Sequence, residues 1–190
     1  NQAVTRRVVT ELGKKAEKEP TEYAEFWGNF GSVLKEGLYE DHERQAELLE
    51  LVRFRSTAGA TDNGALVSLK DYVGRMKEGQ EAIYYITGDD LQTLENSPHL
   101  EGFRARGVEV LLLSAPVDDF WLSAVFEYDG HALTSATRGS TDLSNMGEEA
   151  AKDADDTAEP AKEGDLATLI ALVKQTLGEA VKDVRTTDRL

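Results

Sequence analysis

Apolar residues recur at helical spacing through the first fifty residues of the chain. Three successive segments place them three or four positions apart, as in helices with one buried face. Pro20 and Thr21 separate the first two helices and offer an N-terminal cap, Gly37 predicts the end of the second, and Asp41 predicts the cap of the third. The apolar positions are Val4, Val8 and Leu12; Tyr23, Phe26, Trp27, Phe30 and Leu34; and Leu48, Leu49 and Val52. This pattern predicts a short helical coil over residues 1–53.

A different pattern follows the polar, glycine-containing loop at residues 57–65. Ser68 and Asp71 resemble a capping box at the start of an amphipathic helix. Ile83–Ile86 and Val108–Leu113 are dense runs of β-branched, aromatic and aliphatic residues, typical of buried strands. Further helices are expected at residues 90–96, 98–106 and 117–128. The alternation of strands and helices predicts an α/β class of fold: a small three-layer α/β/α subdomain with a mostly parallel sheet, over residues 54–137.

The predicted helix Val117–Tyr128 carries more apolar residues than one buried face requires. On a helical wheel they cover roughly 240°, against the ~100° stripe that is usual for a surface helix. Trp121 and Val125 lie in the middle of this arc and are expected in the core. Phe120 lies at its edge, beside the polar residues Asp119, Ser123 and Glu127. Such an edge suits either a binding surface or contact with a second packing partner, and the wheel alone does not separate the two.

The last fifty residues change in composition. Residues 138–164 are rich in Ala, Asp and Glu without aromatic residues, which predicts an acidic linker. Residues 165–190 predict one more helix and the start of a strand, with apolar positions at Leu166, Leu169, Ile170, Val173 and Leu177, then at Val181 and Val184. One helix and one strand cannot bury a core. Because the chain also lacks an initial Met, we expect a longer natural protein.

Charge and composition exclude several classes of function. The formal net charge is −15, which opposes binding to nucleic-acid phosphates. The chain has no run of eighteen apolar residues and therefore no expected membrane span. It contains no cysteine, which fits a reducing cytoplasm and leaves no thiolate ligand for a metal.

Two aspartate pairs follow the two predicted strands. Ligands of parallel sheets bind at the carboxyl ends of strands, so four carboxylates there could hold Mg²⁺ for phosphoryl transfer. Alternatively, each pair caps the helix that follows it. The second interpretation is favoured, because neither a glycine-rich phosphate loop nor a catalytic histidine or serine arrangement accompanies these acids. The residues are Asp89, Asp90, Asp118 and Asp119.

Several motifs spread along the chain resemble the heat shock protein 90 chaperone family, in the form found in bacteria. The richest stretch is Ser68–Gly88. Its matching residues are Ser68, Leu69, Tyr72, Val73, Arg75–Glu78, Gln80 and Ile83–Thr87. Other matches are Phe26, Trp27, Phe30, Leu34–Gly37, Leu51–Phe54, Ser97–Glu101, Gly107–Leu111, Phe126–Gly130, Val184, Arg189 and Leu190.

The resemblance implies a position within a larger chaperone. It identifies residues 1–137 with the latter part of the family's middle domain and residues 165–190 with the start of the C-terminal domain. The ATP-binding motifs have no counterpart, so this part is expected neither to bind nor to hydrolyse ATP, whereas the full-length protein uses ATP and Mg²⁺. The resemblance further implies a cytoplasmic homodimer, a monomeric fragment, partly folded client proteins and an Hsp70-type chaperone as partners.

The resemblance also implies a client-binding surface. The family has an acidic residue and an aromatic residue after its last strong strand, followed by a polar residue. The corresponding residues are Asp119, Phe120 and Ser123. Asp119 stands where glutamate is usual, and the tryptophan of the family is shifted by one position. The sequence therefore leaves open whether Phe120 or Trp121 faces solvent.

Overall fold

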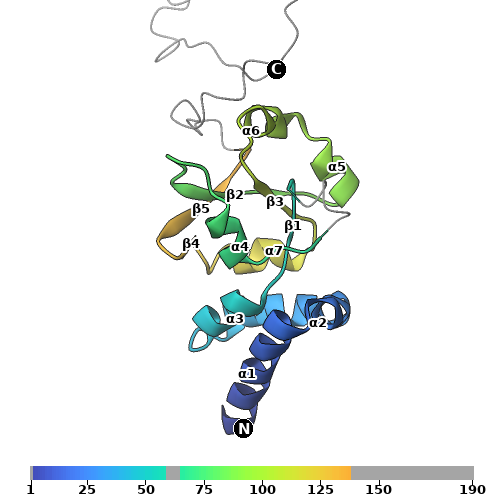
Figure 1. Cartoon of the computed structure of the whole chain (residues 1–190), viewed down its shortest axis with the longest axis vertical. Coiled ribbons are helices and arrows are strands. Elements are labelled where there is room, and N and C mark those ends of the chain that lie inside the picture. The colour runs from blue at the N-terminus through green and yellow to red at the C-terminus, as the bar shows by residue number, and fades with distance from the viewer. Residues whose placement is uncertain (1, 59–64, 138–190) are drawn as a thin grey trace, which may run out of the picture.

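The protein begins with three helices that form one end of the molecule (Figure 1). A computed structural model describes residues 2–58 and 65–137. The helices are α1 (Gln2–Lys18), α2 (Pro20–Glu40) and α3 (Gln45–Leu51). The predicted helical coil is therefore confirmed, although Val4, Val8 and Phe30, which were expected on buried faces, are exposed. Within the described residues, no helix combines the length and the apolar character needed to cross a membrane.

The ends of these helices differ from three sequence predictions. Thr21 provides no cap, because α2 begins at Pro20 and the capping position is Glu19, whose side chain makes no cap hydrogen bond. Gly37 lies inside α2. A Cβ atom there would lie 3.0 Å from Leu48 Cδ1, so this glycine permits close packing of α2 on α3 and does not end the helix. Asp41 ends α2 and holds the turn before α3, accepting a 3.3 Å hydrogen bond from the Arg44 amide.

A five-stranded mixed sheet forms the centre of the other end. Its strands are β1 (Arg55–Ser56), β2 (Ala82–Thr87), β3 (Val110–Leu113), β4 (Glu127–Tyr128) and β5 (His131–Ser135), in the order β1-β3-β2-β5-β4. The three central strands are parallel, with Tyr84 opposite Val110 in β3 and Thr134 in β5. Both edge strands are antiparallel. The mostly parallel prediction holds for the centre of the sheet only.

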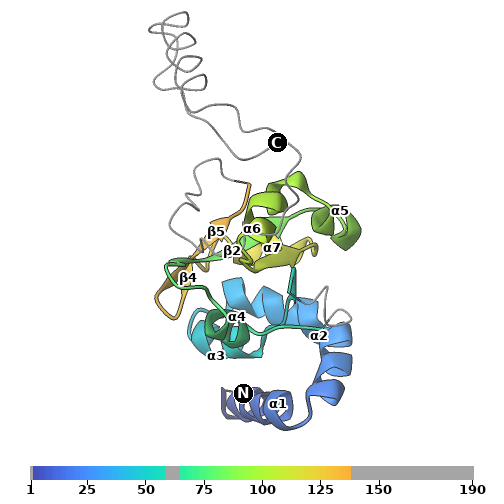
Figure 2. The same cartoon turned by 45° about the horizontal axis from the view of Figure 1, so that its top comes forward.

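Helices cover both faces of the sheet, as the three-layer prediction requires (Figure 2). They are α4 (Leu69–Gly74), α5 (Leu91–Glu95), α6 (Glu101–Ala105), α7 (Val117–Trp121) and the 3₁₀ turn η1 (Pro98–Leu100). Successive strand residues point to opposite faces. Leu111 and Leu113 therefore join a core with α4 and α7, whereas Val110 and Leu112 join a second core with α5 and α6.

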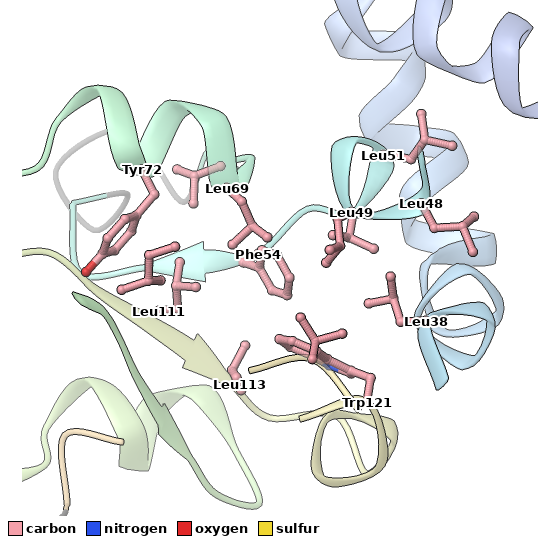
Figure 3. Close-up of a cluster of buried hydrophobic side chains, with 14 residues drawn as sticks. Leu38, Leu48, Leu49, Leu51, Phe54, Leu69, Tyr72, Leu111, Leu113 and Trp121 are labelled. Carbon is pink, nitrogen blue, oxygen red and sulfur yellow. The ribbon is translucent and has the colours of Figure 1, made fainter. Parts of the chain in front are cut away.

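The first core continues into the helical coil. Figure 3 shows Phe54 and Trp121 between leucines of α2 and α3 on one side and of α4 and β3 on the other. The two rings lie 5.6 Å apart. The predicted units 1–53 and 54–137 thus share one hydrophobic core, and the boundary between them remains a prediction.

The predicted helix Val117–Tyr128 is wrong in its second half. Helix α7 ends at Trp121, and Glu127 and Tyr128 form β4, which pairs with β5. The hairpin turn is Asp129-Gly130, with φ of 51° and 78°, as in the Asp-Gly turns that favour two-residue hairpins. Cross-strand pairing therefore overrides the helical spacing. The predicted linker 138–164 and the unit 165–190 lie outside the described residues.

Candidate functional site

Helix α7 turns one side into the core and the other out to solvent. Asp118 and Trp121 point inward and are 1% and 0% exposed. Asp119 and Phe120 point outward, as does Ser123 in the following turn, and Phe120 is 59% exposed. The structure therefore answers the question left open by the sequence. Phe120 is the aromatic residue that reaches solvent, and the buried Trp121 offers no binding surface.

A residue of α2 completes this exposed region. The ring of Tyr39 lies 5.9 Å from the ring of Phe120, with an interplanar angle of 30°. Tyr39 is half-buried and was not predicted from the sequence. The sequence feature that could have indicated this residue is its position on α2, outside the apolar stripe that faces the core. We call Tyr39, Asp119, Phe120 and Ser123 the Phe120 surface.

Local hydrogen bonds fix the shape of this surface. Ser123 Oγ donates a 2.6 Å hydrogen bond to the carbonyl of Phe120 and so closes the end of α7. The Ser123 amide donates to the same carbonyl at 3.1 Å. Ser123 therefore contributes a polar group at the rim while it holds the turn that follows Phe120.

The carboxylate of Asp118 binds three donors. Its Oδ1 accepts hydrogen bonds from Lys35 Nζ at 2.6 Å and from Trp121 Nε1 at 2.8 Å. Its Oδ2 accepts one from the Ala115 amide at 3.0 Å. The role of Lys35 was not predicted from the sequence. The sequence feature that could have indicated it is a lysine beside the buried stripe of α2, because a buried charge requires a partner of opposite charge.

The magnesium hypothesis receives no support from these positions. Asp118 is buried against its three donors, and Asp90 caps α5 by accepting the Thr93 amide at 3.0 Å. The hydrogen bonds from Thr93 hold the pKa of Asp90 below its ordinary value. Asp89 and Asp119 are exposed. Across residues 2–58 and 65–137, no three Asp, Glu, His or Cys side chains are grouped to hold a metal ion.

Other polar groups of the described chain are paired structurally. Tyr72 is the clearest case. Its hydroxyl donates to the Glu109 carbonyl at 2.6 Å and accepts from Gln80 Nε2 and from the Tyr84 amide. Burial raises the pKa of Tyr72 well above its ordinary value. In the part of the chain that the structure describes, no buried side-chain nitrogen or oxygen lacks a hydrogen-bond partner. These polar groups serve the fold, and the Phe120 surface remains the candidate functional site.

Comparison with known sequences and structures gives consistent matches. The model of the family described as Hsp90 protein matches residues 1–190. The chaperone protein HtpG of Roseobacter denitrificans is 53% identical over 188 residues, which cover 99% of this chain and 29% of that protein. HtpG of Rhizobium meliloti is 50% identical, with 98% and 29% covered. The chain thus spans about 29% of the length of these curated relatives.

A solved structure extends the similarity to the fold. The middle domain of a heat shock protein from Plasmodium falciparum superposes with a TM-score of 0.66 and 31% sequence identity. The match covers 73% of this chain and 57% of that chain. The helical coil followed by a small α/β unit is therefore similar to a known middle-domain architecture.

Proposed function

This chain belongs to the Hsp90 protein family, and we propose that it is the scaffolding and client-binding part of an ATP-dependent molecular chaperone. The observation that carries the proposal is the exposure of Phe120, at 59%, beside acidic and polar neighbours. A partly folded protein exposes apolar segments that a folded protein buries. An aromatic ring on a polar surface can bind such segments without forming a large apolar patch.

The chemistry of the Phe120 surface suits weak, repeated binding. Phe120 and Tyr39 provide apolar area with few rotatable bonds, so little conformational entropy is lost on contact. Asp119 adds a negative charge, and the chain as a whole carries −15. We therefore expect a preference for apolar segments flanked by lysine or arginine over apolar segments flanked by acids.

The activities of the whole protein belong to the same proposal. We propose that ATP and Mg²⁺ are bound outside this part of the protein, and that residues 1–190 do not hydrolyse ATP. The full-length protein is proposed to act in the cytoplasm as a homodimer, with an Hsp70-type chaperone as a partner. In that arrangement, the coil and the small α/β unit connect the nucleotide domain to the dimerisation domain.

The test is binding of a permanently unfolded protein to the complete 190-residue chain. Reduced, carboxymethylated α-lactalbumin carrying a fluorophore serves as the probe, and anisotropy gives the Kd. The Phe120→Ala variant should weaken binding about tenfold, the loss expected when a central aromatic contact is removed. Unchanged affinity in this variant contradicts the proposal.

Phe30→Ala is the matched control. Phe30 lies on α2, is 52% exposed and stacks on Phe26 at 5.2 Å, so it resembles Phe120 in exposure and in having one aromatic neighbour. Its removal should leave the Kd for the probe unchanged. An equal loss in both variants indicates general adhesion to exposed rings and not a specific surface.

A further inference from the structure

A buried ion pair joins the helical coil to α7. Lys35 of α2 is 8% exposed and Asp118 of α7 is 1% exposed, and they lie 83 residues apart in sequence. Their Nζ and Oδ1 atoms are 2.6 Å apart. The same ammonium group lies 5.1 Å from the centre of the Phe54 ring, which adds a cation–π contact. The pair is thus enclosed between the helical coil and the α/β unit.

The ion pair determines which residues of α7 face outward. Asp118 is held from three places: by Lys35 in α2, by Trp121 one turn further along α7, and by the Ala115 amide in the turn after β3. The bond from Lys35 ties α7 to α2, and the bonds from Trp121 and Ala115, which lie within the α7 segment, hold the carboxylate in the orientation that meets Lys35. With Asp118 and Trp121 turned inward, Phe120 is necessarily turned outward.

The same two helices meet again at the surface. Tyr39 follows Lys35 by one helical turn on α2, and Phe120 follows Asp118 by two residues on α7. The inner contact is the ion pair, and the outer contact is the ring pair of Tyr39 and Phe120 at 5.9 Å. A shift of α7 relative to α2 would separate the two rings, because each ring is carried by one of the two helices.

Stability alone does not explain a buried charge pair at this position. Apolar side chains of similar volume are often as stable as a buried ion pair, because the pair must offset the loss of hydration of both charges. The ion pair does provide a defined orientation. An apolar contact allows α7 to slide along α2, whereas the short charged hydrogen bond between Lys35 and Asp118 favours one position of α7 on α2.

We propose that Lys35 is a positioning residue for client binding: through Asp118, it holds Phe120 against Tyr39, so that clients meet a platform of two rings. This inference rests on the proposed function. Lys35 itself does not contact the client, since its ammonium group is buried against Asp118 and Phe54. It acts through the orientation of α7.

The double variant K35M/D118N tests the inference without leaving a single buried charge. Its fold is checked by circular dichroism and urea unfolding. The specific readout is the nuclear Overhauser effect between the rings of Tyr39 and Phe120, which a general change in stability does not move. We expect this signal to be lost and the Kd for carboxymethylated α-lactalbumin to rise about three- to tenfold. A folded double variant that retains the ring contact or the wild-type Kd overturns the proposal.

A second variant keeps the test decisive if the double variant does not fold. Tyr39 is half-buried near the surface, so Tyr39→Ala is expected to fold. It should weaken probe binding about three- to tenfold, and unchanged binding overturns the two-ring platform. Failure of the proposed function gives a different result, since Phe120→Ala would then also bind normally. If Phe120→Ala alone weakens binding, only the role of Lys35 and Tyr39 is rejected.

Discussion

The adjacent aromatic residues Phe120 and Trp121 should differ sharply in what they contribute to stability. We consider their separate replacement by alanine. Phe120 is 59% exposed, so about two fifths of the residue is buried, and its ring lies 5.9 Å from that of Tyr39. Complete burial of a phenylalanine is worth about 1.5–3 kcal/mol, and the buried fraction therefore contributes about 1 kcal/mol. We expect Phe120→Ala to lower the free energy of unfolding by this amount or less.

Trp121→Ala removes a fully buried side chain. It empties the space beside Phe54 and takes away the indole N–H that binds Asp118 at 2.8 Å. Large-to-small changes of this kind cost about 3–5 kcal/mol, because the lost burial and the remaining cavity both destabilise the fold. The loss of one donor to a buried carboxylate adds to that cost.

Urea unfolding followed by far-ultraviolet circular dichroism measures both variants. The slope m should be the same in each, so that the midpoints report stability alone. A cost above about 3 kcal/mol for Phe120→Ala would show that this ring is core, since only an emptied core site costs that much. A cost below about 1.5 kcal/mol for Trp121→Ala would contradict its burial in the first core.

Three further predictions concern the α/β unit, and urea unfolding measures each. Tyr72→Phe should cost about 2–4 kcal/mol, because it leaves buried backbone and amide partners of the hydroxyl unpaired; a cost near zero contradicts this network. Ser68→Ala should lower the free energy of unfolding by about 1 kcal/mol, because it breaks the capping box with Asp71. Ser123→Ala, which removes an exposed serine, is the comparison variant. The free energy of unfolding should fall as pH rises above about 10. Burial raises the pKa of Tyr72, and burial together with the Glu50 carboxylate raises the pKa of Tyr128, so the unfolded chain releases these protons at a lower pH than the folded chain does. A free energy of unfolding that stays constant to about pH 11.5 contradicts these shifts.

Features that depend on neighbouring residues were predictable from the sequence. The capping box of Ser68 and Asp71 involves residues three positions apart, and the structure contains both of its hydrogen bonds. The dense strand Ile83–Ile86 lies within β2, and Gly107 has the positive φ of 62° expected just after a helix. In each case the residue type and its immediate neighbours determine the conformation.

Features that depend on distant residues were not predictable in the same way. The apolar residues after Trp121 fit a helical wheel, but β4 forms because β5 pairs with it. The Asp129-Gly130 pair is a local sequence feature that favours this hairpin, and a helical wheel does not take it into account. Lys35 with Asp118, and Tyr39 with Phe120, join α2 to α7 across some eighty residues. Only the packing of the coil on the α/β unit brings them together.

The central claim is that partly folded proteins bind at the Phe120 surface. The most direct measurement is a titration of the ¹⁵N-labelled chain with unlabelled carboxymethylated α-lactalbumin, followed by two-dimensional NMR. We predict that the largest shift changes fall at Tyr39 and residues 119–123, and that Phe120→Ala abolishes them. Native, folded α-lactalbumin should cause none. Shift changes that concentrate elsewhere, or that persist in Phe120→Ala, would contradict the account.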